Sequence, residues 1–261
     1  MDAAATTTAV PAPARFNPIL PYTAVLRTDL RQTLQSWVFR LWFLISLVAA
    51  LGYGLYKFGI HREVGLVQSA SEQTGVLLRA VSMVTLAFVS LVGVIAIGGE
   101  RGSLADSVLS RGISRYQYFA AKWHARTLMV LAGFAVLSTL VLTAYHFLLE
   151  PDITLNGGIA ATIVALSGLA AMVAWGTTVG ALSKGTVIGV VIFWVILFGA
   201  LFLLSFVPEP FPSPNQLISQ MRSTLRGNFE WMKIAKIAGI FLGLAVLGGT
   251  IGLIGFGKKD V

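Results

Sequence analysis

The residues able to support catalysis are few, and their spacing does not assemble a site. The chain has three histidines and no cysteine. A serine nucleophile at Ser167, inside a long apolar run, would need a histidine base within hydrogen-bonding reach. His61 and His124 fall in connections between runs, and His146, near the end of a run, suits an interfacial position better than metal ligation. No aspartate falls inside an apolar run, which excludes an intramembrane aspartyl pair. We therefore expect no enzyme activity and no metal site.

Nucleotide chemistry is not encoded in this chain either. A P-loop needs a glycine, four residues, and then Gly-Lys followed by Ser or Thr. Lys184-Gly185-Thr186 has its lysine and glycine in the wrong order, and Gly257-Lys258-Lys259 is not followed by a strand–helix unit. Any ATP-driven step would need ATP and Mg²⁺ bound to another subunit, with no cofactor in this chain.

Long apolar runs dominate the sequence, and the helices that they form must position any functional residues. The chain of 261 residues is 56% hydrophobic and 11% charged, with a mean hydropathy of +0.81. Each run is close to the ~20 residues with which a helix crosses ~30 Å of hydrocarbon. The six runs are Trp37–Tyr56, Val76–Gly98, Thr127–Leu149, Gly158–Leu182, Thr186–Val207 and Ile234–Phe256. We therefore predict an all-α membrane protein with six transmembrane helices over residues 37–261.

The distribution of positive charge predicts the orientation of these spans. The net charge is +8, which in a soluble chain would suggest nucleic acid, but basic residues also flank spans because cytoplasmic loops retain Lys and Arg. Eleven of the 19 basic residues fall on the side that holds both termini, and the short Glu150–Gly157 connection has none. We expect both termini in the cytoplasm of a cell-membrane protein that binds no nucleic acid. The basic connection between the fifth and sixth runs argues against this orientation.

Three segments outside the spans have their own patterns. Residues 1–19, rich in Ala, Thr and Pro, are predicted to be a disordered tail without the features of a cleavable signal. Residues 20–36 predict an amphipathic helix, with Asp29 on its polar face, that lies in the membrane interface or packs against a soluble partner. In the outer segment 208–232, Pro214 suits a helix start and Gly227 a helix end.

The polar segment 99–126 predicts two short helices joined by a turn. Ser103 can cap the first, and Ser110-Arg111-Gly112 breaks it. Ser114 can cap the second, with Gln117 as its capping-box partner, and Ile113 with Tyr118 would form a hydrophobic staple. Such an elbow could transmit force from an external partner to two spans. The alternative is an ordinary basic loop that fixes topology.

This segment resembles the signature region of permease subunits in the type-2 exporter family of ATP-binding-cassette (ABC) transporters. The family shows an acid, Gly-Thr-Leu, a Leu-Leu-Ser stretch, Pro-hydrophobic-Ser-Arg and a later Lys. The matching positions are Glu100, Gly102-Ser103-Leu104, Val108-Leu109-Ser110, Gly112-Ile113-Ser114-Arg115 and Lys122. Ser103 replaces the usual Thr and Gly112 the common Pro. By layout the chain is similar to permeases that serve nitrous oxide reductase maturation.

The resemblance implies a half-transporter in which two copies pair, as a homodimer, and each binds a cytoplasmic ATPase subunit. It implies that the segment around Glu100 contacts the ATPase. The coupling residues that it implies are Glu100, Arg101, Gly102, Ser103, Leu104, Leu109, Ser114, Arg115, Tyr118 and Lys122. Glu100 alternatively serves as a charge carrier at the mouth of the pathway.

Polar residues are sparse in the spans that the family layout assigns to the pathway. The candidates are Arg40, Ser82, Thr85 and Ser205. They favour an apolar or amphipathic cargo, although Arg40 alternatively extends its side chain to the cytoplasmic headgroups. A secondary transporter or channel would need acids inside spans or repeats with broken helices, and no Asp or Glu lies well inside a run. A membrane scaffold or assembly factor remains as a second alternative.

Overall fold

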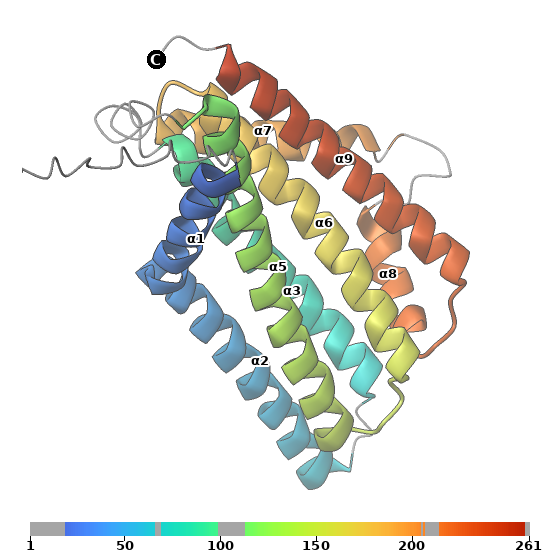
Figure 1. The fold of residues 1–261 in the computed structure, drawn as a ribbon. Helices are drawn as coiled ribbons and strands as arrows, with labels where there is room; N and C mark the ends of the chain where they lie inside the picture. Colours follow the sequence, from blue (N-terminus) through green and yellow to red (C-terminus); the bar gives the residue numbers. More distant parts are fainter. Residues whose placement is uncertain (1–18, 66–68, 99–112, 205, 207–213, 259–261) are drawn as a thin grey trace, which may run out of the picture.

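The computed structural model describes residues 19–65, 69–98, 113–204, 206 and 214–258, and their regular structure is entirely helical. The helices are α1 (Ile19–Gln35), α2 (Trp37–Val64), α3 (Ala70–Gly98), α5 (Arg115–Leu148), α6 (Leu155–Leu182), α7 (Thr186–Leu204), α8 (Pro214–Leu225) and α9 (Trp231–Gly257). Figure 1 shows them as one bundle of long helices with α1 across one end. The predicted tail lies almost wholly outside the described residues.

Four of the described helices are long and apolar enough to cross a membrane: α2, α5, α6 and α9. They indicate a membrane protein. Two further apolar stretches, Val84–Ile97 in α3 and Thr186–Ala200 in α7, are shorter. The six-span arrangement is thus supported for four helices, and for α3 and α7 it stays a prediction.

Local capping explains where several helices begin and end. The Ser36 side chain accepts a hydrogen bond from the Phe39 backbone N–H and caps α2, so the chain bends between α1 and α2 at a single residue (Figure 1). Thr154 caps α6 in the same way. Gly65 and Gly227 have φ of 67° and 90°, a left-handed conformation that costs glycine little. The predicted start of α8 at Pro214 and its end before Gly227 are confirmed.

Glycines at the helix contacts let α3 approach α6 and let α5 approach α9. A Cβ atom on Gly180 of α6 would overlap the carbonyl oxygen of Val94 in α3. On α9, Gly249 and Gly252 meet the rings of Trp123 and Phe119. Glycines at such positions let helix backbones approach closely enough for van der Waals packing to stabilise the bundle.

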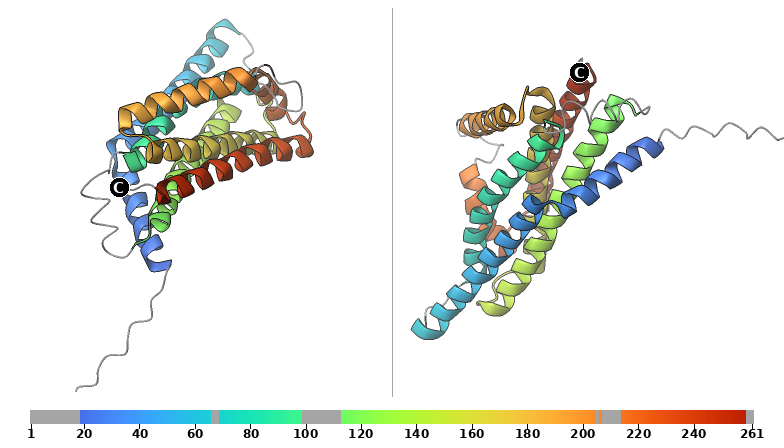
Figure 2. Two further views of the ribbon diagram at one scale, coloured as in Figure 1. Left: turned by 90° about the horizontal axis from the view of Figure 1, so that it is seen from above. Right: turned by 90° about the vertical axis from the view of Figure 1, so that its left-hand side faces the viewer.

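Helices α2 and α7 lie at the edges of this bundle. Trp42 of α2 stacks on Phe88 of α3, with ring centroids 4.5 Å apart. Phe193 of α7 is buried against Val94 and Val179, while Phe198 and Phe202 in the C-terminal half of α7 are exposed. Figure 2 shows α7 turned away from the direction of the long helices. Both edge helices therefore present wide apolar surfaces.

Candidate functional site

A buried charge cluster joins α1 to the first turns of α5. The Asp29 Oδ1 atom accepts hydrogen bonds from Lys122 Nζ at 3.3 Å and from Arg126 Nη2 at 3.0 Å. The side chains of Asp29 and Lys122 are only 2% and 4% exposed. Lys122 and Arg126 are one helical turn apart, so both reach the same carboxylate of the neighbouring helix. We call these three residues the Asp29 cluster.

Within the Asp29 cluster, one carboxylate faces two cations. Asp29 Oδ2 and Arg126 Nε are buried without a hydrogen-bond partner in the described part of the chain. A buried ion pair contributes little net stability when complete, but losing one partner leaves an uncompensated charge and is strongly destabilising. The main effect of the cluster is therefore to fix the position of α1 on α5, and its net contribution to the stability of the protein is small.

A second polar contact lies on the same interface. The Tyr22 hydroxyl of α1 lies 2.8 Å from His124 Nδ1 of α5, and the direction of this hydrogen bond depends on the histidine tautomer. Burial raises the pKa of the Tyr22 hydroxyl above its ordinary value, which keeps the phenol protonated near neutral pH. Tyr22 and Asp29 are seven residues apart, so α1 is held at two points along one face.

This arrangement corrects the predicted polar face of α1. Asp29, expected on the polar face, is one of the most buried residues of the helix. The docked face includes Tyr22 and Asp29 because α5 offers cations as well as apolar side chains. One feature of the sequence could have indicated that Asp29 pairs with a cation: it is the only acidic residue between Ile19 and Ser36.

The start of α5 is the part of the predicted coupling segment that the structure describes, and local contacts hold it firmly. Ser114 accepts from the Gln117 backbone N–H and the Gln117 side chain accepts from the Ser114 N–H, both at 3.1 Å, which confirms the capping box. Tyr118 is buried and stacks with Phe256 of α9, and Ile113 packs on the same cluster. Lys122 lies over the Tyr118 ring, 5.3 Å from its centroid.

The predicted coupling residues form two groups, those outside the described part of the chain and those at the start of α5. Glu100, Arg101, Gly102, Ser103, Leu104 and Leu109 lie outside the described residues. Ser114 is exposed and Arg115 is half-buried, whereas Tyr118 and Lys122 face inward. The two buried residues thus position α5 instead of offering a surface to a partner.

The described pathway candidates are not brought together. Arg40 is exposed, and its Nε donates to the Leu34 carbonyl of α1 at 3.3 Å. Thr85 is fully buried between α2 and α3, where its hydroxyl accepts from Trp42 Nε1 at 3.3 Å. The Ser82 side chain and Ser205 lie outside what the structure describes. Arg40 and Thr85 therefore contact different helices, α1 and α2, and do not share a partner.

A second polar network, which the sequence reading missed, joins distant segments at the opposite end of the bundle. Asp152 Oδ2 accepts from Ser69 and Ser71 hydroxyls at 2.6 Å each and from Arg226 Nε at 2.9 Å. Burial favours a raised pKa for this carboxyl, but the hydrogen bonds from these residues outweigh it and lower the pKa to about 2. The network ties α3 and α8 to the connection between α5 and α6.

Two comparisons, with protein families and with curated proteins, found no match. No protein-family model matches the sequence, and no curated protein shows significant similarity to it. The function is therefore inferred from the residues themselves and from their arrangement.

Proposed function

We propose that this chain is the transmembrane permease subunit of an ABC exporter, driven by a separate cytoplasmic ATPase. The resemblance of residues 100–122 to the type-2 exporter signature supports this proposal. The described part of that segment, from Ser114 onward, is a firmly capped helix start packed against α1 and α9. A loop that only fixed topology would not need such packing.

The Asp29 cluster is the observation that carries the proposal. It makes α1 and the first turns of α5 one unit, through a buried ion pair that cannot slide without exposing charge. Helix α5 is 34 residues long and continues to the Asp152 end of the bundle. A push on the segment before Ser114 would therefore move α1 and the whole of α5 together.

In this mechanism the ATPase binds ATP and Mg²⁺, and its closure displaces the segment before Ser114. The movement of α1 and α5 would switch the pathway between inward and outward access, as rigid-body rearrangements do in other transporters. A second copy of the chain would complete the pathway, and the exposed apolar surfaces of α2 and α7 offer area for that contact. The sparse polarity of the spans favours an apolar or amphipathic cargo.

Affinity purification of the chain from its native membrane in mild detergent, followed by mass spectrometry, tests the proposal. We expect a stoichiometric ATPase with a P-loop. Changing Glu100 and Arg115 to Ala should abolish its recovery, whereas Lys184→Ala, at an exposed position between α6 and α7, should retain it. An intact chain that purifies without any ATPase would contradict the proposal and favour a secondary transporter or a scaffold.

A further inference from the structure

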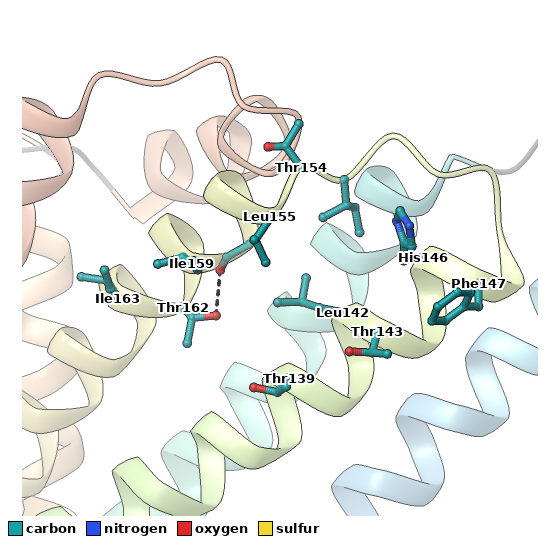
Figure 3. A pocket seen from close by; sticks show the side chains of 12 residues that line it. Thr139, Leu142, Thr143, His146, Phe147, Thr154, Leu155, Ile159, Thr162 and Ile163 are labelled. Carbon is teal, nitrogen blue, oxygen red and sulfur yellow. Dashed lines mark hydrogen bonds between the residues drawn. The ribbon is translucent and has the colours of Figure 1, made fainter.

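A groove between α5 and α6 lies apart from the Asp29 cluster, near the Asp152 end of the bundle. Its volume is about 470 Å³, within the range of pockets that hold small molecules. Figure 3 shows side chains of α5, from Thr139 to Phe147, on one side and side chains of α6, from Leu155 to Ile163, on the other. The α5 side is about 12 Å long at 1.5 Å per residue. Both helices are among those able to cross a membrane, so a ligand would enter from the hydrocarbon region.

The residues that line the groove disfavour a charged ligand. None of the twelve lining residues is Asp, Glu, Lys or Arg, so an ionised ligand group would lack a counter-ion in a poorly hydrated place. Apolar side chains form most of the wall: Leu142, Phe147, Ile153, Leu155, Ile159 and Ile163. A long hydrocarbon group fits this surface.

The polar side chains of the groove that lack a hydrogen-bond partner in the described part of the chain lie at one end, because the Thr154 hydroxyl donates to the Leu225 carbonyl at 3.3 Å. The hydroxyls of Thr139 and Thr162 donate to carbonyls of their own helices, at 2.8 Å each. The Thr143 hydroxyl and the His146 imidazole have no hydrogen-bond partner among the described residues, and they lie three residues apart near the end of α5. These two groups could bind one hydroxyl or carbonyl of a ligand.

The floor of the groove has space behind it. Leu142 and Thr162 also line a small inner cavity of about 20 Å³ between α3, α5 and α6. The buried hydroxyl of Thr74 borders this cavity and has no hydrogen-bond partner in the described part of the chain. Shortening Leu142 would therefore enlarge the groove inward instead of collapsing it.

We infer that this groove binds a neutral single-chain amphiphile from the membrane. Its hydrocarbon chain lies along the apolar wall between α5 and α6, and its terminal hydroxyl or carbonyl hydrogen-bonds to Thr143 and His146. This site is independent of the ATPase proposed above and would be present in a protein with another function.

The test uses the full chain in phosphatidylcholine nanodiscs with a diazirine-bearing monoacylglycerol as the probe. Photolabelled peptides are mapped by mass spectrometry, and we expect labels concentrated between residues 139 and 163. Excess unlabelled monoacylglycerol should remove this labelling, whereas the surrounding phosphatidylcholine should not.

Two variants and a control make the result specific. Thr143→Phe should fill the groove and lower labelling about fivefold or more, the effect of about 1 kcal/mol of steric cost, whereas Leu142→Ala should increase labelling. Leu140→Phe, at an exposed position of α5 outside the groove, should leave it unchanged. Labels spread over exposed faces such as α7, equal in all variants, would mean ordinary surrounding lipid only and would overturn the inference.

Discussion

Asp29 Oδ1 and Lys122 Nζ lie 3.3 Å apart although 93 residues separate them in the chain. Arg126 binds the same oxygen, so one carboxylate holds two cations of α5. The contact fixes α1 on the helix that follows the predicted coupling segment. The docking of α1 and the proposed mechanism both depend on this contact.

Asp29→Asn should destabilise the protein strongly. It removes the carboxylate that faces the buried Lys122 and Arg126 cations, and breaking a buried ion pair by removing one partner usually costs about 3–5 kcal/mol. Thermal unfolding of the purified protein in detergent measures this loss. Glu230→Gln, which removes an exposed ion pair with Lys233, is the control and should change stability by less than about 0.5 kcal/mol.

A triple variant separates charge from packing at the same place. Asp29→Leu combined with Lys122→Met and Arg126→Met removes all three charges and should unfold at a higher temperature than Asp29→Asn alone, since complete apolar replacement of a buried ion pair is often neutral. If the triple variant is the less stable of the two, uncompensated charge is not what makes Asp29→Asn costly.

Asp152 should make stability depend on pH in the acid range. Its pKa in the folded protein is about 2, below the ordinary value of 3.8, so the folded state favours the ionised form. The contribution is fully present above about pH 4 and is lost as the pH falls through 2, and its size is on the order of 2 kcal/mol.

Unfolding temperatures measured from pH 6 to pH 2 test whether stability falls as Asp152 becomes protonated. Asp152→Asn should lower stability at pH 6 and flatten its decline toward pH 2. Glu72→Gln, at a carboxylate about half exposed in its pair with Arg222, should have a smaller effect at either pH. An Asp152→Asn curve parallel to that of the original protein would contradict the assignment.

Two glycine positions should respond in opposite directions to the same substitution. Gly180→Ala would place a Cβ atom in overlap with the Val94 carbonyl oxygen and 2.8 Å from the Val94 Cα, and the backbone of α3 must then move. We expect a loss of about 1–3 kcal/mol. Gly239→Ala, with open space around its Cβ position, should be neutral or stabilise α9 by up to about 1 kcal/mol. Thermal unfolding of both variants measures these changes in stability. An equal change in the two variants would show that α3 and α6 pack less closely than described.

Single cysteines can establish whether α7 crosses the membrane, because the natural chain contains none. Lys184 and Asn228 are exposed residues before α7 and after α8. With six spans and cytoplasmic termini, Asn228→Cys should react with a membrane-impermeant maleimide in intact cells, whereas Lys184→Cys should react only after the membrane is opened. Reaction of both in intact cells would place both ends of α7 on the outer side, and the reverse pattern would invert the orientation.

The sequence alone determined the features that depend on neighbouring residues. The length and continuity of apolar runs marked the membrane helices, because a helix must satisfy its backbone within itself to cross hydrocarbon. The capping box of Ser114 and Gln117, the start of α8 at Pro214 and the turn at Gly227 were predictable because each involves residues a few positions apart.

Only the tertiary structure decided which polar residues meet. Asp29 looked like any polar residue of an amphipathic helix, and its burial followed from the angle at which α1 docks on α5. Asp152 and Arg226 are 74 residues apart, and the groove along Thr143 and His146 exists because α5 and α6 diverge there. Helical periodicity assigns a residue to one face of its own helix, whereas the partner of that face is set by how all the helices pack together.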